Sequence, residues 1–258
     1  MHWHVVVVAI AVAGCSKPAP HRDDVRPVAP APPAAADGGN ATIGDAAVAT
    51  TIDAGVDAAS LAIVDAPIKW SAAREQLTLD YRRKHSDTRA TDLVIDPKVI
   101  VLHYTGGSSA KSTRNYFDNL EIEASRKELA RGGKVNVSAH FLVDRDGTIY
   151  RLQPETRFAR HCIGLNHVAI GIENVGDGKQ YPLTDAQVAA DAALVRELSA
   201  RFHITHLLGH SEVMKFRDHA YFVELDPSYH NDKDDPGAAF MARVRERVAD
   251  LGLAGLAR

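Results

Sequence analysis

Residues 98–107 read Lys-Val-Ile-Val-Leu-His-Tyr-Thr-Gly-Gly, and this stretch decides the class of fold that we expect. The four consecutive aliphatic residues Val99 to Leu102 are too few for a helix and mostly β-branched, so they predict a buried strand. The strand ends where polar and glycine residues begin a loop. His103 therefore stands at the end of a buried strand, which is where functional side chains gather in open α/β sheets.

A second histidine has the same setting. Ile204 to Gly209 reads as a short strand that ends at His210. For either histidine alone, a core residue with a hydrogen-bonded ring is the plainer interpretation. Two histidines in equivalent positions point to a joint role, and a metal site is the first chemistry to test.

The patterns on either side of these strands predict that strands and helices alternate. Expected helices are Ser71–Arg83 with Ser71 as N-cap, Ser112–Leu120, a helix opened by a Thr184–Gln187 capping box, and Phe240–Leu251. Further strands are expected at Val137–Val143 and Thr148–Leu152, which form a hairpin around Asp144–Gly147, and at His167–Asn174. The expected fold class is therefore α/β, a mixed central β-sheet flanked by helices.

Length and composition predict one folded domain and an unstructured segment. The 258 residues are 45% hydrophobic and only 6% aromatic, which fits a single medium domain better than two. Residues 16–66 hold fifteen Ala and six Pro, and no aromatic residue lies between Trp3 and Trp70. Such a stretch buries too little apolar surface to offset its ordering entropy, so we expect a disordered tether reaching roughly 40 Å. The folded domain is expected over residues 67–258.

The first fifteen residues resemble a lipoprotein-type signal peptide. The apolar run Val5–Ala13 is too short to cross a bilayer as a helix, and Val12-Ala13-Gly14-Cys15 is similar to a bacterial lipobox. The resemblance implies cleavage before Cys15 and a lipid on its sulfur, which would anchor the protein in a membrane. Histidines stand where a signal peptide usually carries Lys or Arg, so ordinary secretion and a misassigned start codon are the alternatives.

Charge and cysteine content exclude several classes of protein. Thirty basic and thirty-three acidic side chains leave a net charge of -3, so no basic surface for nucleic acid is expected. Cys15 and Cys162 are the two cysteines, too few for a disulfide scaffold or a cysteine-only metal site. Cys162 is expected to be an unpaired, inert thiol.

A zinc site needs a third protein ligand beside His103 and His210, and a carboxylate is a common choice. Asp235 is our candidate, although Asp before Pro and a helix is also a standard N-cap arrangement. One carboxylate has two oxygens and can serve both roles. The gap between His210 and Asp235 contains three alternative ligands: His219, Asp226 and His230.

Five motifs occur in an order that resembles type 2 N-acetylmuramoyl-L-alanine amidases. They are Val-Ile-Val-Leu-His103, Val-Ser-Ala-His140-Phe-Leu-Val with Asp146-Gly147, Ile-Gly-Ile-Glu173, Gly-His210-Ser-Glu, and Lys233-x-Asp235-Pro-Gly. These zinc enzymes share their fold with peptidoglycan recognition proteins. The resemblance implies that His103, His210 and Asp235 hold one zinc ion, with water in the fourth position. It also implies that Glu173 and Lys233 act on a peptidoglycan or muropeptide substrate.

Other residues are candidate substrate contacts. His161 resembles a family histidine that follows tryptophan and lines the substrate groove, although Arg160 replaces the tryptophan here. Thr105 and Asn174 are further candidates. His140 is expected to support the site from its strand. The aromatic residues in the gap before Asp235 form either one wall of the cleft or a small separate core: Phe216, Tyr221, Phe222 and Tyr229.

The expected function is hydrolysis of the amide between N-acetylmuramoyl residues and L-alanine, in the cell envelope. The expected protein is exported, lipid-anchored to a bacterial membrane and facing the periplasm. Two alternatives remain: a peptidoglycan-binding module that does not cut its ligand, and a zinc hydrolase that acts on another amide.

Overall fold

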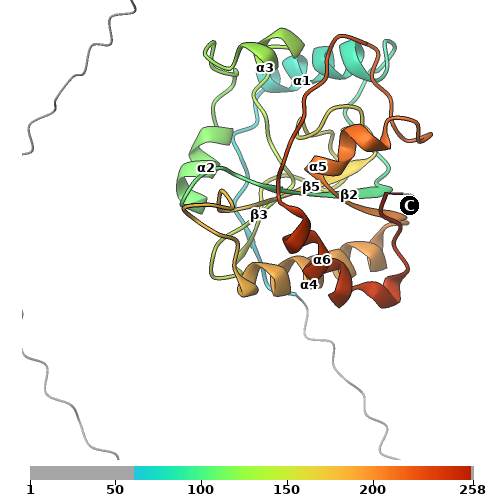
Figure 1. The fold of residues 1–258 in the computed structure, drawn as a ribbon. Helices are drawn as coiled ribbons and strands as arrows, with labels where there is room; N and C mark the ends of the chain where they lie inside the picture. The colour runs from blue at the N-terminus through green and yellow to red at the C-terminus, as the bar shows by residue number, and fades with distance from the viewer. Residues whose placement is uncertain (1–60, 257–258) are drawn as a thin grey trace, which may run out of the picture. The chain divides into compact units, whose positions relative to one another are not determined.

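A computed structural model describes residues 61–256 of the chain. Within that range six strands form one sheet in the order β1-β4-β3-β5-β2-β6 (Figure 1). The strands are β1 (Ile63–Asp65), β2 (Val99–Tyr104), β3 (Phe141–Val143), β4 (Ile149–Arg151), β5 (Ala169–Asn174) and β6 (His206–Gly209). β3 and β4 pair antiparallel as the predicted hairpin, and the other neighbouring pairs are parallel. The predicted mixed sheet is confirmed.

The four predicted helices form within a few residues of their predicted ends, as α1 (Ala72–His85), α2 (Ala110–Phe117), α4 (Asp185–Arg201) and α6 (Ala238–Arg247). The described range also holds the short helices α3 (Lys127–Gly132) and α5 (His210–Val213) and the 3-10 turns Met214–Phe216 and Ala249–Leu251. The Ser71 side chain caps α1 by accepting a hydrogen bond from the Arg74 N–H. Thr184 and Gln187 form the predicted capping box of α4. These side chains satisfy N–H groups that a helix start leaves free.

The two faces of the sheet pack against different partners. α4 and α6 lie together on one face (Figure 1), where Val195 and Val244 join the same apolar cluster as Leu102 and Ile172. On the opposite face, alternate residues of β2 pack against Leu165 and the α5 region. Because successive side chains of a strand point to opposite faces, β2 and β5 supply residues to both layers.

Two short elements differ from the sequence prediction. β1 lies ahead of the domain start predicted at Pro67, and its backbone pairs with β4 at the edge of the sheet. α3 has no side-chain cap, and it lies in a stretch expected to be irregular. Elements of three and six residues leave too little periodic pattern to predict them. The predicted signal segment, Cys15 and most of the predicted tether lie outside the described residues.

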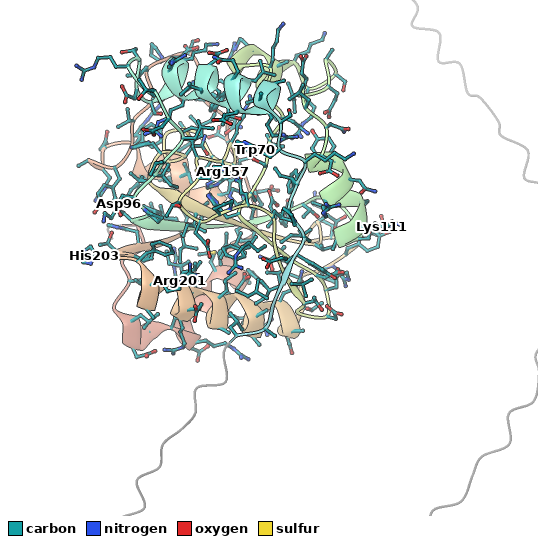
Figure 2. All side chains as sticks on the ribbon, turned by 180° about the vertical axis from the view of Figure 1, so that it is seen from behind. Trp70, Asp96, Lys111, Arg157, Arg201 and His203 are labelled. Atoms are coloured by element: carbon teal, nitrogen blue, oxygen red, sulfur yellow. The ribbon has the colours of Figure 1, made fainter. Side chains whose placement is uncertain are left out.

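Trp70, just before the start of α1, packs against the side chain of Arg157. The guanidinium carbon of Arg157 lies 4.2 Å from the ring centroid of Trp70, and Figure 2 shows the two residues together. Contacts of this kind stabilise a cation against an aromatic face.

Among the described residues, no helix has the length and apolar character that spanning a membrane requires.

Candidate metal centre

Three functional candidates meet at the carboxyl edge of three adjacent parallel strands. β6, β2 and β5 lie side by side, with His210 directly after β6 and His103 and Glu173 near the ends of β2 and β5. His103 lies opposite Glu173 in the parallel register, so both side chains leave the same face. The expected joint position of the two histidines is confirmed.

Asp235 completes a cluster of three donor atoms. The Nδ1 atoms of His103 and His210 lie 3.0 Å apart, and Oδ2 of Asp235 lies 3.4 Å from the former and 3.2 Å from the latter. Within residues 61–256, this is the group of histidine, cysteine or acidic side chains whose ligand atoms converge closely enough for a metal ion. His103 and Asp235 are buried, and the His210 side chain is 11% exposed.

Local packing brings Asp235 to the two histidines. Its carbonyl oxygen accepts a hydrogen bond from the backbone N–H of Ser211, which fixes it beside the start of α5. A Cβ at Gly209 would lie 3.1 Å from Pro236, so glycine lets the two segments approach. The N-cap of α6 is Gly237. Asp235 therefore serves the cluster and not the helix start, which decides between its two expected roles.

The charges of the cluster depend on one another. Burial alone would raise the pKa of Asp235, but the close approach of the His103 and His210 rings outweighs burial and holds that pKa far below its ordinary value. Burial and the neighbouring His210 lower the pKa of His103 to about 4. The site thus presents an ionised carboxylate and a neutral His103 imidazole, the protonation states that metal ligands require.

These donors fit a tetrahedral zinc ion. Zinc binds histidine nitrogen and carboxylate oxygen at about 2.0–2.2 Å, which places the ligands of a tetrahedron roughly 3.3–3.5 Å apart. The three separations in the cluster, 3.0, 3.2 and 3.4 Å, lie at or slightly below that value. Two nitrogens and one carboxylate oxygen are also a donor set found at catalytic zinc.

Glu173 and Lys233 line the same cleft as the three donor residues. The volume of this cleft is about 420 Å³. Burial and the nearby Asp235 raise the pKa of Glu173 to about 8, while Lys233 acts in the opposite direction. Oε2 of Glu173 is buried without a hydrogen-bond partner among the described residues. A buried carboxylate oxygen without a partner is suited to act on a ligand in the cleft.

One wall of the cleft comes from the long segment between His210 and Asp235. Tyr229 lines the cleft, and its hydroxyl accepts a hydrogen bond from the buried Arg160 guanidinium. Arg160 also donates to three backbone carbonyls and lies over the ring of Tyr81. Arg160, which stands where the family resemblance implies a tryptophan, therefore connects several segments of this wall.

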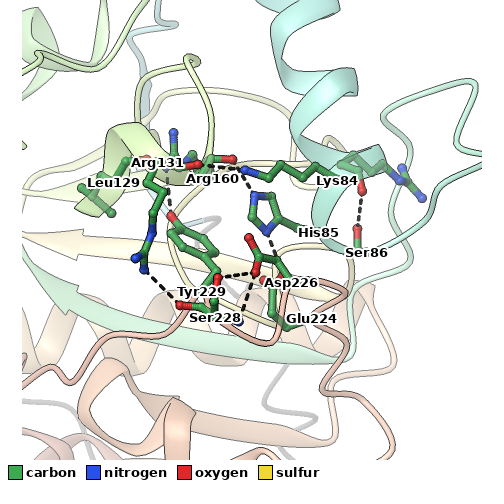
Figure 3. A network of polar contacts seen from close by, with 12 residues as sticks. Lys84, His85, Ser86, Leu129, Arg131, Arg160, Glu224, Asp226, Ser228 and Tyr229 are labelled. Carbon is green, nitrogen blue, oxygen red and sulfur yellow. Dashed lines mark hydrogen bonds and ion pairs between the residues drawn. The ribbon is translucent and has the colours of Figure 1, made fainter. Parts of the chain in front are cut away.

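A buried histidine joins this wall to α1 and α3 (Figure 3). His85 Nδ1 lies 2.8 Å from the Glu224 carboxylate, and His85 Nε2 lies 2.6 Å from the carbonyl oxygen of Gly132. Arg131 donates to the carbonyl of Ser228 in the same network. Segments far apart in the sequence are thus connected behind Tyr229.

Asn174 lies away from the cleft, contrary to the prediction that it contacts substrate. Its side chain is fully buried and donates to Asp191 of α4 at 2.9 Å. The reason is the alternation along β5: Glu173 faces the cleft, so the next residue faces α4. Thr105 does line the cleft, while its hydroxyl accepts hydrogen bonds from Gly107 and Gly176 in the surrounding loop.

His161 and His140 lie behind the cluster. His161 lines the cleft, but its Nδ1 faces His103 and its Nε2 faces the carbonyl of Ala169, so neither nitrogen is free for substrate. His140 accepts from the Gly171 N–H and lies 2.8 Å from the Arg157 carbonyl, which confirms its supporting position. Burial lowers the pKa of His161 well below its ordinary value.

The alternative ligands in the long segment lie elsewhere. His219 stacks on Phe216, Asp226 accepts hydrogen bonds from Ser228, and His230 is exposed. The four aromatic residues of this segment serve in both expected roles: Phe216, Tyr221, Phe222 and Tyr229. All four pack into apolar clusters, and Tyr229 also lines the cleft. Cys162 is buried and forms no disulfide among the described residues, and burial raises the pKa of its thiol well above the ordinary value.

The residues that line the cleft without having been predicted include Tyr104, Tyr116 and Arg126. The Tyr104 hydroxyl donates to Asp234, while Arg126 donates to the Tyr116 hydroxyl. Tyr104 directly follows His103 in the sequence, and this position could have indicated that it lies near the cleft. Tyr116 and Arg126 come from α2 and the start of α3, whose position over the cleft depends on tertiary packing.

Known proteins resemble the part of the chain that carries this centre. A family described as N-acetylmuramoyl-L-alanine amidase matches residues 94–238, more than half of the chain, including every candidate site residue named above except Cys15. The chain is 23% identical over 130 residues to peptidoglycan recognition protein 3 of Mus musculus, which is 49% of this chain and 37% of that protein. It is 31% identical over 100 residues to the endolysin of Escherichia phage T7, which is 37% of this chain and 66% of that protein.

A solved structure is also similar. N-acetylmuramoyl-L-alanine amidase LysC from Clostridium intestinale URNW shares 25% identity with this chain, with a TM-score of 0.46. The match covers 75% of this chain and 99% of that one. The chain spans just over a third of the mouse protein and just under two thirds of the phage protein.

Proposed function

The chain belongs to the N-acetylmuramoyl-L-alanine amidase family, and on this premise we propose that it is a zinc-dependent amidase of peptidoglycan or muropeptides. The bond cut is the amide between the lactyl group of N-acetylmuramic acid and L-alanine. One observation carries the proposal: His103, His210 and Asp235 present three donor atoms 3.0–3.4 Å apart inside a cleft that also holds the Glu173 carboxylate.

His103, His210 and Asp235 would hold the zinc ion. Bound there, zinc lowers the pKa of a water molecule toward neutrality and polarises the carbonyl of the substrate. The ionised Asp235 supplies the one negative charge of the ligand set. Each ligand comes from a different segment, so the folded domain must form before the three donors meet.

Glu173 would carry the proton of the reaction. Its carboxylate takes a proton from the attacking water and gives it to the amine that leaves, so the acid and base steps use the same oxygen atoms. A group does this best when its pKa lies near the working pH, and the pKa of Glu173 is raised to about 8. Its unpartnered Oε2 is the atom that we assign to the transfer.

Lys233 would stabilise negative charge on the substrate oxygen. It lines the cleft two residues before Asp235, and its ammonium group is attracted to the oxyanion that forms when water attacks the carbonyl. A positive charge fixed beside the reacting carbonyl acts more strongly in the transition state than in the ground state.

The alternatives predict different sites or products. A binding module without activity needs neither a complete ligand set nor a proton carrier, and the three candidate ligands and the Glu173 carboxylate in one cleft support the enzyme instead. A zinc hydrolase of another amide would keep the same centre and differ in the substrate that it accepts. Family membership favours the muropeptide substrate.

The test is digestion of purified muropeptides by the full chain, with products identified by mass. We expect release of free stem peptide, loss of activity on chelation and recovery with zinc. Intact muropeptide bound to the protein would favour the binding module. Tight zinc binding without release or binding of muropeptide would favour another amide substrate.

We further propose that the protein works in the bacterial cell envelope, held to a membrane by a lipid on Cys15. The support is the Val12-Ala13-Gly14-Cys15 motif and the Ala- and Pro-rich stretch that follows it. Labelling with radioactive palmitate tests the proposal: the full chain should incorporate label, and Cys15→Ser should not. Equal labelling of the two proteins, or of neither, would overturn it.

A further inference from the structure

His103 is held from behind by a second histidine. Its Nε2 atom lies 3.1 Å from Nδ1 of His161, and the two rings meet edge to face with centroids 5.2 Å apart. The opposite nitrogen of His103, Nδ1, faces His210 and Asp235. His103 therefore has one nitrogen in the donor cluster and one in a contact with His161.

A backbone carbonyl decides which nitrogens carry hydrogen. The carbonyl oxygen of Ala169 lies 3.3 Å from His161 Nε2 and can only accept, so that nitrogen is the N–H donor. In a neutral His161 ring, Nδ1 is then an acceptor, and it takes a hydrogen bond from His103 Nε2–H. The Nδ1 atom of His103 is left with its lone pair directed at His210 and Asp235.

We propose that His161 is a positioning residue that keeps His103 in the Nε2–H form and fixes its ring with Nδ1 toward the metal site. The inference deepens the proposed function and rests on it for the identity of the metal. Metal-binding histidines usually donate their other N–H to a protein group, which fixes both tautomer and orientation. Here the accepting group is a neutral imidazole.

The strand beneath His161 leaves room for this arrangement. Gly171 lies on the cleft face of β5, two residues before Glu173, where any other residue would direct a side chain at the ring. A Cβ built on Gly171 would lie 2.6 Å from His161 Cγ and 2.7 Å from Nδ1. The glycine is thus a condition for the close approach of His161 to the sheet.

A matched pair of variants separates hydrogen bonding from packing. Asn and Leu have similar size and shape, but only Asn offers an oxygen near the position of His161 Nδ1. We expect His161→Leu to weaken zinc binding by about 10- to 100-fold and His161→Asn to recover most of that loss. Affinity is measured on the full chain by competition with a chromophoric chelator. Equal affinities for the two variants would overturn the proposal.

Gly171→Ala tests the same contact without changing a ring. The new methyl group should displace His161 and weaken zinc binding in the same direction as His161→Leu. Because both changes break one contact, the double variant should lose no more affinity than His161→Leu alone. Wild-type affinity in Gly171→Ala, or additive losses in the double variant, would contradict the proposal.

The tautomer of His103 can be read without metal. Nitrogen-15 NMR of the metal-free full chain at neutral pH should show the Nε2–H form of His103, and His161→Leu should lose that preference. An Nδ1–H form in the wild-type protein would overturn the inference whatever the zinc affinity. Failure of the wild-type chain to bind zinc would instead overturn the proposed function, so the two failures are distinguishable.

Discussion

His103 on β2 lies directly opposite Glu173 on the neighbouring parallel strand β5. Parallel strands lie about 4.8 Å apart, and residues opposite each other point to the same face. A histidine of the donor cluster and the proposed proton carrier are therefore neighbours by virtue of backbone pairing, with no loop between them. The relative position of these two groups therefore depends on the pairing of β2 with β5.

Glu173→Gln should keep zinc and lose turnover. The amide has nearly the same shape as the carboxylate but cannot take a proton from water, so we expect turnover to fall by about 10²- to 10⁴-fold. Zinc content by mass spectrometry and stem-peptide release by chromatography measure the two effects. Loss of zinc together with activity would mean that Glu173 supports the ligand set and is not the proton carrier.

Asp235→Asn should weaken zinc binding strongly, because the ligand set loses its one negative charge. Asp226→Asn is the matched control, since Asp226 lies in the same long segment and, among the described residues, its carboxylate accepts hydrogen bonds only from Ser228. We expect Asp226→Asn to bind zinc as the wild-type protein does. The reverse pattern would move the third ligand into the segment before Asp235.

Asp191 should make the domain less stable as pH rises. Burial raises its pKa from 3.8 to about 7, while the Asn174 amide acts in the opposite direction. In the unfolded chain Asp191 ionises near pH 3.8, whereas in the folded protein it stays protonated up to about pH 7. Between these pH values, ionisation stabilises the unfolded state alone. The free energy of unfolding should fall over this window by at most about 4 kcal/mol.

Chemical denaturation of Asp191→Asn at several pH values measures this contribution. The variant should lose the part of the pH dependence that lies between pH 4 and pH 7, because an amide does not ionise. Glu197→Gln, on the same helix and partly exposed, is the control that should leave the profile unchanged. A profile of Asp191→Asn identical to wild type would refute the assignment.

Tyr229→Phe should destabilise the domain. It removes the hydroxyl that accepts from the buried Arg160, which costs about 1–3 kcal/mol when a buried donor is left without a partner. Tyr221→Phe is the comparison, because its hydroxyl makes no hydrogen bond with the described residues, and a change within about 0.5 kcal/mol is expected. Thermal unfolding of both variants measures the difference. Equal stability of the two would show that the Arg160 contact contributes nothing.

The sequence predicts the elements that have strong local patterns. The aliphatic run before His103, the capping box at Thr184 and the hairpin turn at Asp144–Gly147 each carry a local signal, and the structure confirms them. The positions of His103 and His210 at strand ends also predict that they meet. Local patterns and the rule that parallel strands share a carboxyl edge are sufficient for this much.

What the sequence does not predict depends on contacts between distant segments. The role of Arg160 depends on the Leu129 carbonyl of α3, on the Val135 carbonyl after that helix and on Tyr229, which packing brings together. The prediction that Asn174 contacts substrate was wrong, and the sequence itself could have shown this. Alternation along β5 puts Asn174 on the face opposite Glu173, where it contacts Asp191. Gly171, in an otherwise aliphatic strand, was a signal for the close approach of His161.

The hydrogen-bonded histidine pair takes its direction from the Ala169 carbonyl, a group that every amino acid would supply at that position. A substitution at Ala169 would therefore leave the direction of the pair unchanged, provided that the new side chain fits this fully buried position. A deletion within β5 would have a larger effect, because it would shift the Ala169 carbonyl, Gly171 and Glu173 relative to one another and to β2. The spacing of these residues along the strand therefore matters as much as the identity of Gly171 and Glu173.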